Sequence, residues 1–297
     1  MGEAENTQVV VAIIGAGQMG AAVGRRLRES GARVLTSLRG RSRESAQRVR
    51  DADLEVVDDD TALTTMADFI FSIVPPGAAI EVANRFKAPI AGSKGKPLFV
   101  ECNAISPATT RNAEAIIGPM SFIDAGIIGG PPVSGTLDPA KGPRFYASGP
   151  NAHKLTRLAT YGIDVAILDV PVGAASGLKL AYAGLTKGFT ALAAAMVGTA
   201  AREGLAEALR SELARTQPAF LARIERALPD MLPKAYRWVA EMEQISEFIG
   251  DATEGAAIYQ GAASLFESIA AECSEDVPDD LVSRLTDFCS GRRNSRS

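Results

Sequence analysis

A glycine-rich turn, GAGQMG at residues 15–20, directly follows an apolar, β-branched run at residues 9–14. The sequence AAVGRRLRES after it predicts a helix, so that strand, G-x-G-x-x-G and helix occur in the order of a dinucleotide-binding motif. Gly15 permits the tight turn, Gly17 lets the backbone approach a pyrophosphate, and Gly20 lets helix and strand pack closely. The positive end of the helix dipole favours the anion. The alternative is a turn that holds no ligand. The predicted cofactor contacts of this turn are Gly15, Gly17, Gln18, Met19 and Gly20.

The second expected strand, residues 33–38, indicates which dinucleotide binds. An NAD site needs Asp or Glu about twenty residues past the glycines, to accept hydrogen bonds from the ribose hydroxyls. Here the sequence reads SLRGRSR, with no acid before Glu44. Arginine offers planar, multidentate donors that suit a 2′-phosphate. We therefore predict NADP(H) as the cofactor, bound by Arg39, Arg41 and Ser42. The alternative is a basic loop that is only solvated.

Two further loops are expected to flank the nicotinamide. The strand at 68–74 ends in PPG, and the strand at 97–102 runs into NAISP. Ligands of open α/β sheets bind outside the carboxyl ends of the strands, where both loops must lie. Cys102 at this edge is interpreted as a small buried side chain rather than a reactive thiol. The predicted contacts from the two loops are Val74, Pro75, Pro76, Asn103 and Ala104.

These motifs require an α/β domain followed by a helical one. We predict a Rossmann domain at 1–170 and an all-helical domain at 171–297 that binds substrate and dimerises, joined by a long helix at 173–204. Further strands are expected at 54–57, 122–127, 144–148 and 164–168, and helices at 42–51, 60–66 and 151–160. After the long helix, helices are expected at 205–216, 219–227, 233–249, 253–273 and 278–289.

Charge and hydropathy exclude several classes of protein. The 297 residues carry a formal net charge of −4 with a pI near 5.3, which argues against a nucleic-acid partner. The long helix has fourteen uncharged residues at 188–201, fewer than the ~20 needed to cross a bilayer, so no membrane partner is expected. Its small residues favour close packing of helices, within the chain or between two copies.

The beginning of the chain and the cysteines indicate a compartment. No basic start and apolar core precede the first strand, so we expect no secretory signal. Three cysteines without metal-ligand spacing fit a reducing environment. We predict a cytoplasmic protein without a metal site, in which the single histidine, His153, lies at the surface.

The order of these motifs resembles the β-hydroxyacid dehydrogenase superfamily, which includes 6-phosphogluconate dehydrogenase and hydroxyisobutyrate dehydrogenase. Within it, the chain looks most like the branch with the C-terminal domain DUF1932. The resemblance implies a Rossmann domain, a long connecting helix and an all-helical domain, usually in a homodimer. It also implies a catalytic lysine, which corresponds to Lys179. The resemblance is carried by the glycine turn, NAISP at 103–107, FIDAGIIGGPP at 122–132, RFYASGP at 144–150, GLK at 177–179 and RWVAEME at 237–243.

A lysine suits the chemistry that this resemblance implies. Oxidising an alcohol needs a base for the hydroxyl proton while hydride leaves for the nicotinamide, and reduction needs an acid at the new alkoxide. A lysine partly desolvated in a cleft can have its pKa lowered and serve in both directions. Tyr182 lies on the same helix face as Lys179, and is a second predicted catalytic residue. The alternative for Lys179 is a structural or solvated lysine, and the alternative for Tyr182 is a packing role.

Two departures from the family pattern concern the substrate. The superfamily often has an asparagine four residues after its lysine, where this chain has Ala183. The serine of the family's Asp-x-Pro-Val-Ser-Gly-Gly pattern is replaced by Ile128, which removes a donor for a substrate carboxylate. A larger, less polar carbonyl or imine compound then fits better than a small hydroxyacid. The predicted substrate contacts are Asp124, Ile128, Gly129, Trp238 and Glu241.

Three functions follow in order of preference. The first is an NADPH-dependent oxidoreductase that interconverts a carbonyl and an alcohol on a small molecule, with Lys179 as general acid and base. The second is an imine reductase acting on C=N, because relatives with this architecture reduce imines, often without the lysine. The third is an inactive NADP-binding interaction module, against which the retained Lys179 argues.

Overall fold

The computed structural model describes residues 8–250, 253–273 and 281–291. The chain divides into two compact units, which we call unit 1 (Met1–Leu180) and unit 2 (Ala181–Ser297). The division falls inside the long helix α6 (Ala174–Arg202), whose first two turns therefore belong to unit 1. The boundary predicted from the sequence, at residue 170, lies just before this helix.

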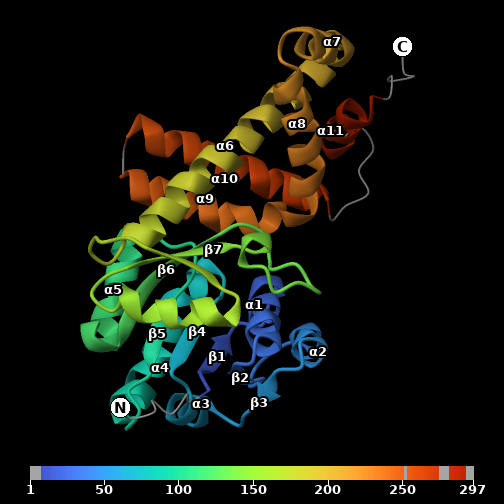
Figure 1. Cartoon of the computed structure of the whole chain (residues 1–297). Helices are drawn as coiled ribbons and strands as arrows, with labels where there is room; N and C mark the ends of the chain where they lie inside the picture. The colour runs from blue at the N-terminus through green and yellow to red at the C-terminus, as the bar shows by residue number, and fades with distance from the viewer. Residues whose placement is uncertain (1–7, 251–252, 274–280, 292–297) are drawn as a thin grey trace. The chain divides into compact units, whose positions relative to one another are not determined.

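Within the described residues, unit 1 contains one eight-stranded sheet in the order β3-β2-β1-β4-β5-β6-β7-β8 (Figure 1). Strands β1 to β6 are parallel, β7 is antiparallel to β6, and β8 is parallel to β7. The strand order reverses between β1 and β4, which is where an open sheet of this type binds its ligand. The strands are β1 (Val10–Ile14), β2 (Arg33–Thr36), β3 (Glu55–Val56), β4 (Phe69–Ser72), β5 (Leu98–Glu101), β6 (Phe122–Ile128), β7 (Arg144–Ser148) and β8 (Asp164–Ile167).

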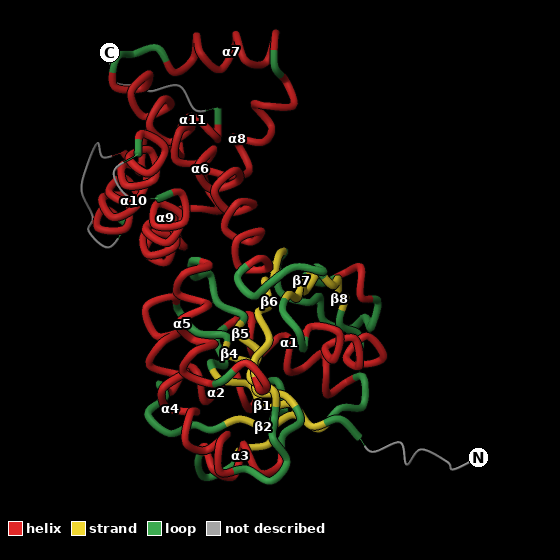
Figure 2. Tube along the Cα trace, turned by 90° about the vertical axis from the view of Figure 1, so that its left-hand side faces the viewer, coloured by secondary structure: helices red, strands yellow, loops and turns green. Residues whose placement is uncertain are grey.

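Helices cover both faces of this sheet (Figure 2). Successive side chains of a strand point to opposite faces, so Val11 of β1 packs in one core cluster with Leu27 of α1. Its neighbour Ala12 packs in the other cluster with Phe86 of α4. Burial on both faces explains why the parallel strands read as continuous apolar runs. The helices of unit 1 are α1 (Gln18–Glu29), α2 (Arg43–Asp51), α3 (Asp60–Met66), α4 (Ala79–Gly92) and α5 (Pro107–Ile117).

The predicted strands are all present, most with ends shifted by one or two residues. Helices α4 and α5 were not predicted. Pro89 lies inside α4 and interrupts the helical pattern, whereas α5 opens with a recognisable cap, Ser106 followed by Pro107. The helix predicted at 151–160 is a 3₁₀ helix, Ala152–Tyr161.

Unit 2 is helical, as predicted. Helices α9 and α10 pack against each other, and Trp238 meets Phe266 edge-on with ring centres 5.2 Å apart. The helix predicted at 219–227 corresponds to α8. Its predicted end is wrong, because α8 continues through Pro229 to Met231. The predicted start of the last helix, at 278–280, lies outside the described residues. The remaining helices are α7 (Ala206–Thr216), α8 (Pro218–Met231), α9 (Ala235–Ile249), α10 (Glu254–Glu272) and α11 (Leu281–Ser290).

Helix α6 is long and apolar enough to cross a membrane by length and composition alone, and 44% of its most apolar 18-residue window is buried. Both of its lysines interact within their own unit. Lys179 donates to a backbone carbonyl of unit 1, and Lys187 pairs with Glu241 of unit 2. In this fold α6 therefore has the role of a connecting core helix.

Candidate active site

The glycine turn between β1 and α1 is shaped by main-chain contacts. Gly15 has a φ of +92°, and a Cβ there would lie 2.2 Å from the carbonyl oxygen of Ile73. A Cβ on Gly20 would lie 2.2 Å from the carbonyl oxygen of Gly15. A Cβ on Gly17, by contrast, would have no described atom within 4 Å. Gly15 and Gly20 therefore make room for the protein, whereas Gly17 leaves room for a ligand.

The N-terminus of α1 faces this turn without an acceptor of its own. In the described structure no side chain caps the first-turn N–H groups after Gly17, and that turn holds no acidic residue. Gln18 is exposed, and Met19 packs against the core. Since the first N–H groups of a helix need acceptors and carry partial positive charge, this end of α1 fits a pyrophosphate.

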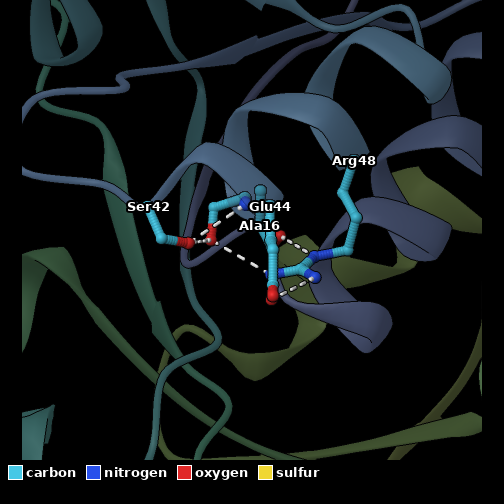
Figure 3. A network of polar contacts seen from close by, with 5 residues as sticks. Ala16, Ser42, Glu44 and Arg48 are labelled. Atoms are coloured by element: carbon cyan, nitrogen blue, oxygen red, sulfur yellow. Dashed lines mark hydrogen bonds and ion pairs between the residues drawn. The ribbon is translucent and has the colours of Figure 1, made fainter.

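Arg48 of α2 links the glycine turn to the neighbouring basic loop (Figure 3). Its Nε donates to the carbonyl oxygen of Ala16 at 3.1 Å, and a terminal nitrogen donates to Ser45 Oγ at 3.1 Å. The other terminal nitrogen lies 3.8 Å from the Glu44 carboxylate. Ser42 caps α2 by accepting from the Ser45 N–H. One side chain thus holds together the two loops predicted to contact the cofactor's phosphates.

The predicted phosphate contacts Arg39 and Arg41 are exposed on the loop between β2 and α2. Although Arg41 is exposed, partial desolvation and then the positive charge of Arg85 lower the pKa of its guanidinium, against Asp60 and Glu81. Asp60 itself pairs with Arg85 at 2.8 Å. Two exposed guanidinium groups on one loop suit an anionic ligand.

Asn103 joins the two loops predicted to flank the nicotinamide. Its side chain is buried; Oδ1 accepts from the Val74 N–H at 2.6 Å, and Nδ2 donates to Ser72 Oγ at 2.9 Å. Its amide therefore fixes the loop after β4 against the loop after β5. The other predicted residues of these loops, Pro75, Pro76 and Ala104, are exposed or partly exposed at the same edge, and their contact with a cofactor stays a prediction.

Asp124 of β6 holds the N-terminus of α6. Its carboxylate is fully buried and accepts from the N–H groups of Gly173 at 2.8 Å and Ala175 at 3.1 Å. The hydroxyls of Ser148 and Ser176 donate to it at 2.7 and 2.6 Å. A negative charge at a helix N-terminus is stabilised by these donors and by the helix dipole. Both carboxylate oxygens of Asp124 thus accept hydrogen bonds from the chain itself, which gives Asp124 a positioning role, and its contact with a substrate stays a prediction.

Gly126, two residues further along β6, lets α6 approach the sheet. A Cβ there would lie 2.5 Å from the carbonyl oxygen of Ala175 and 3.2 Å from the Cβ of Lys179. The Lys179 ammonium in turn donates to the carbonyl oxygen of Cys102 at 3.0 Å. The predicted catalytic amine therefore lies at the carboxyl end of β5, and the Cys102 side chain is buried as predicted.

Glu101, the last residue of β5, is a fully buried carboxyl beside this lysine. Its Oε1 accepts from the Asn103 N–H at 2.8 Å, while Oε2 has no hydrogen-bond partner in the described part of the chain. The pKa of Glu101 is raised to about 8, mainly by burial and also by the charge of Asp124, against the Asn103 hydrogen bond and the charge of Lys179. Burial likewise raises the pKa of the Cys102 thiol well above its ordinary value.

The predicted substrate residues Ile128 and Gly129 lie beyond the end of β5. The last residue pair between β5 and β6 is Glu101 with Asp124, so β6 continues past that edge. Ile128 is partly buried, and Gly129 is exposed with a φ of +126°. An apolar side chain and a glycine therefore border the space outside the carboxyl edge of the sheet.

In unit 2, Trp238 and Glu241 both contact Lys187, a residue that was not predicted to belong to the site. Glu241 forms an ion pair with Lys187, whose ammonium lies 4.9 Å from the centre of the Trp238 ring. The side chains of Lys187 and Glu241 are only 23% and 12% exposed. Tyr182, also assigned to unit 2, is 53% exposed on α6. The roles of these residues toward a substrate stay predictions.

The described residues do not meet the usual requirements of a metal site. Within the described residues, no group of three or more His, Cys, Asp or Glu side chains is arranged to hold a metal ion. His153 is exposed, as predicted, on the 3₁₀ helix that follows β7.

Four residues of functional interest were missed in the sequence: Arg48, Glu101, Gly126 and Lys187. Glu101 carried a signal, since it is the one charged residue of the otherwise apolar strand LFVE. Buried charges need a partner or a function. Gly126 is also a signal, because glycine inside a strand often marks a close approach of another backbone. Arg48 and Lys187 depend on partners that no local pattern indicates.

Comparison with known families agrees with this architecture. Residues 10–159, just over half of the chain, match the family described as the NAD binding domain of 6-phosphogluconate dehydrogenase. Residues 200–269 match a second family, described as a domain of unknown function, DUF1932.

Solved structures share the fold over nearly the whole chain. A conserved protein of unknown function, described as structurally similar to 3-hydroxyacid dehydrogenases, is 27% identical with a TM-score of 0.65, over 87% of this chain and 97% of that one. Mycobacterium tuberculosis 3-hydroxyisobutyrate dehydrogenase, solved with L-serine, is 16% identical with a TM-score of 0.68, over 94% and 98%. A reductive aminase from Aspergillus terreus, in complex with NADPH4, cyclohexanone and allyl amine, is 16% identical with a TM-score of 0.53, over 95% and 99%.

The glycine turn and most of the sheet thus lie within the first match, and most of the helical unit lies within the second, with most of α6 between them. The chain belongs to the family that carries the NAD binding domain of 6-phosphogluconate dehydrogenase, with a DUF1932 domain after it, and it has the fold of the hydroxyacid dehydrogenases.

Proposed function

We propose that this protein is an NADPH-dependent oxidoreductase that interconverts a carbonyl group and an alcohol, with Lys179 as general acid and base. The observation that carries the proposal is the position of the Lys179 ammonium, 3.0 Å from the Cys102 carbonyl oxygen. This is the same edge of the sheet as the glycine turn, since β1 and β5 are parallel members of one sheet. Ligands of such a sheet bind outside this edge.

The choice of NADP(H) over NAD(H) is supported by the loop after β2. It offers the exposed side chains of Arg39 and Arg41 to a 2′-phosphate. Glu44, the first acid in this region, lies in the first turn of α2, and its carboxylate is 3.8 Å from Arg48. Arginine recognises phosphate in a bidentate manner, so we expect this loop to discriminate between the two dinucleotides.

In the proposed mechanism the nicotinamide, when bound, supplies or accepts the hydride. Gly17 and the N-terminus of α1 bind the pyrophosphate, and Arg48 keeps this turn fixed relative to the basic loop. Asp124 and Gly126 set the position of the first turns of α6, and hence of Lys179. During reduction Lys179 gives one proton to the substrate oxygen and is left as a neutral amine; during oxidation it takes that proton back.

The substrate class follows from the residues at the end of β6. Ile128 offers no donor to a carboxylate, and the exposed Gly129 adds no side chain. We therefore propose a carbonyl compound larger and less polar than a simple hydroxyacid. Tyr182, Trp238 and Glu241 remain candidates for substrate contact from the helical unit.

We also propose that the helical unit forms a homodimer of a cytoplasmic protein. Leu185, Leu192 and Met196 of α6 are 76%, 63% and 54% exposed. Their spacings of seven and four residues place them on one helix face, which a second copy of the chain would cover. Light scattering after size-exclusion chromatography should show a dimer, and Leu192→Glu should shift it toward monomer; a monomeric wild type contradicts the dimer.

The second candidate is an imine reductase, favoured by the similarity in fold to the reductive aminase. We rank it second because this chain retains Lys179, and the reduction of an imine gives this lysine no equally clear role. An inactive NADP-binding module is the third.

One experiment separates the three functions. The full chain is incubated with NADPH and a panel of ketoacids, ketones and cyclic imines, and NADPH oxidation is followed by absorbance. Turnover of carbonyl compounds supports the first function, and turnover of imines alone supports the second. NADPH binding, measured by its fluorescence, without any turnover supports the third.

A further inference from the structure

Glu101 is a charged residue that the fold buries without fully satisfying it. The side chain is 0% exposed, and only one of its two oxygens accepts a hydrogen bond within the described chain. Leaving a buried acceptor without a donor is costly, and an ionised one costs more. A strand that only needed to fill the core would place an apolar residue here, as at Leu98, Phe99 and Val100.

The charged groups around Glu101 come from three elements. Asp124 of β6 repels its negative form, but that carboxylate is committed to the N-terminus of α6. Lys179 of α6 attracts the negative form, and the thiol of Cys102, directly after β5, is buried beside them. Glu114 of α5 acts on Asp124 from further out. Lys179 is therefore the cation whose charge favours ionisation of Glu101.

We infer that Glu101 is a positioning residue for Lys179: the buried carboxyl and the amine titrate as a coupled pair, so that Glu101 sets the pH range over which Lys179 keeps its proton. The inference rests on the proposed function of Lys179. Two observations on Glu101 carry it: the carboxyl is completely buried, and its Oε2 has no hydrogen-bond partner in the described residues. The third is that the Lys179 ammonium donates to the carbonyl oxygen of the next residue, Cys102.

The coupling has a direct consequence for acid–base chemistry. When Glu101 is ionised, its charge favours the ammonium form of Lys179; when Lys179 loses its proton, the neutral carboxyl becomes favoured. Each group thereby shifts the pH range over which the other titrates. Where Glu101 is ionised, its charge favours the ammonium that reduction requires.

The test measures the protonation of Lys179 without substrate. Full-length wild type and Glu101→Gln are pulsed with acetic anhydride across the neutral-to-alkaline range, and acetylation of Lys179 is quantified by mass spectrometry, because only the neutral amine reacts. Gln keeps an oxygen for the Asn103 N–H. We expect the midpoint of Lys179 reactivity to fall by about 1 to 3 pH units in Glu101→Gln, the usual effect of losing a nearby opposite charge. An unchanged midpoint overturns the inference.

The matched control is Glu114→Gln, which removes a carboxyl on α5 whose charge acts on Asp124. It should leave the Lys179 midpoint in place; an equal shift would mean a general field effect and would also overturn the inference.

A second variant tests the pair from the other side. In Lys179→Met, the infrared band of a protonated carboxyl should persist to higher pH than in wild type, because the cation that favours ionised Glu101 is gone. A band that titrates as in wild type contradicts the coupling. Neither readout involves turnover, so failure of the coupling can be distinguished from failure of the proposed oxidoreductase activity.

Discussion

The two ends of the candidate site are built by different means. At the phosphate end, the fit for a ligand comes from main chain: an uncapped helix N-terminus, a glycine that opens onto free space, and exposed arginines nearby. At the lysine end, it comes from buried charges, with Asp124 satisfied by the N-terminus of α6 and Glu101 left with one unpartnered oxygen. The first arrangement is suited to binding, whereas the second is suited to controlling a proton.

This difference predicts which property a substitution at each end of the site should change. Changes at the phosphate end should affect cofactor affinity with little effect on folding. Changes at the lysine end should affect turnover, pH dependence and stability, because the same buried groups support the helix and the amine.

Lys179→Ala should produce the largest effect. If the amine transfers the proton, turnover of the best carbonyl substrate should fall by ~10²-fold or more, while NADPH binding measured by fluorescence is retained. Lys141→Ala, a change at an exposed lysine of unit 1, should leave turnover intact. Full activity in Lys179→Ala would remove the proposed mechanism.

Asp124→Asn should come next, as a loss of stability. An amide replaces one acceptor oxygen with a donor that faces the N–H groups of α6, so the free energy of unfolding should fall by about 2 to 3 kcal/mol. Urea unfolding followed by circular dichroism measures it. Asp51→Asn, at an exposed end of α2, is the control; equal small losses in both would mean that Asp124 does not anchor the helix.

The double change Arg39→Ala and Arg41→Ala tests the phosphate end. Loss of charge-assisted hydrogen bonds of about 1.5 kcal/mol or more should raise the Michaelis constant for NADPH at least about tenfold, and that for NADH much less. Arg50→Ala, an exposed arginine of α2, should change neither. Equal effects on both cofactors would contradict the NADP(H) assignment.

Gly17→Ala should have a smaller and more selective effect. Its Cβ enters open space, so thermal stability should be unchanged while NADPH affinity weakens by roughly 1 kcal/mol, or about fivefold, through a displaced hydrogen bond. Gly92→Ala, where an added Cβ also meets no described atom, should keep both properties. Unchanged NADPH affinity in Gly17→Ala would mean that the open space does not receive the cofactor.

The final prediction concerns the pH dependence of stability. Because the pKa of Glu101 is raised from 4.5 to about 8 in the folded chain, mainly by burial, the folded state holds a proton that the unfolded state releases; the effect concerns stability alone and neither turnover nor cofactor binding. That contribution is complete below pH 4.5 and is lost as pH rises through about 8. Glu101→Gln should therefore lose less stability across this window than wild type, measured by urea unfolding at both ends. Parallel pH profiles would show that Glu101 is not protonated in the folded protein.

The parts predictable from sequence are those in which local backbone demands dictate residue type. The glycine turn was predictable because Gly15 and Gly20 tolerate no side chain and follow a strand in a fixed order. Helix α4 was missed because Pro89 disturbs its pattern. The role of Asp124 could not be foreseen, since its partners lie about fifty residues later in the chain. The same holds for Lys187 and Glu241, which meet only when α6 packs with α9.

The bare backbone at Gly126 also matters for protein engineering. With the Ala175 carbonyl and the Lys179 Cβ so close, even a methyl group at this position would displace the first turn of α6, and the reactive amine with it. A mutant library intended to change the substrate range should therefore keep position 126 constant and diversify Ile128 and Gly129. Selection can then vary the proposed substrate contacts while the position of Lys179 stays unchanged.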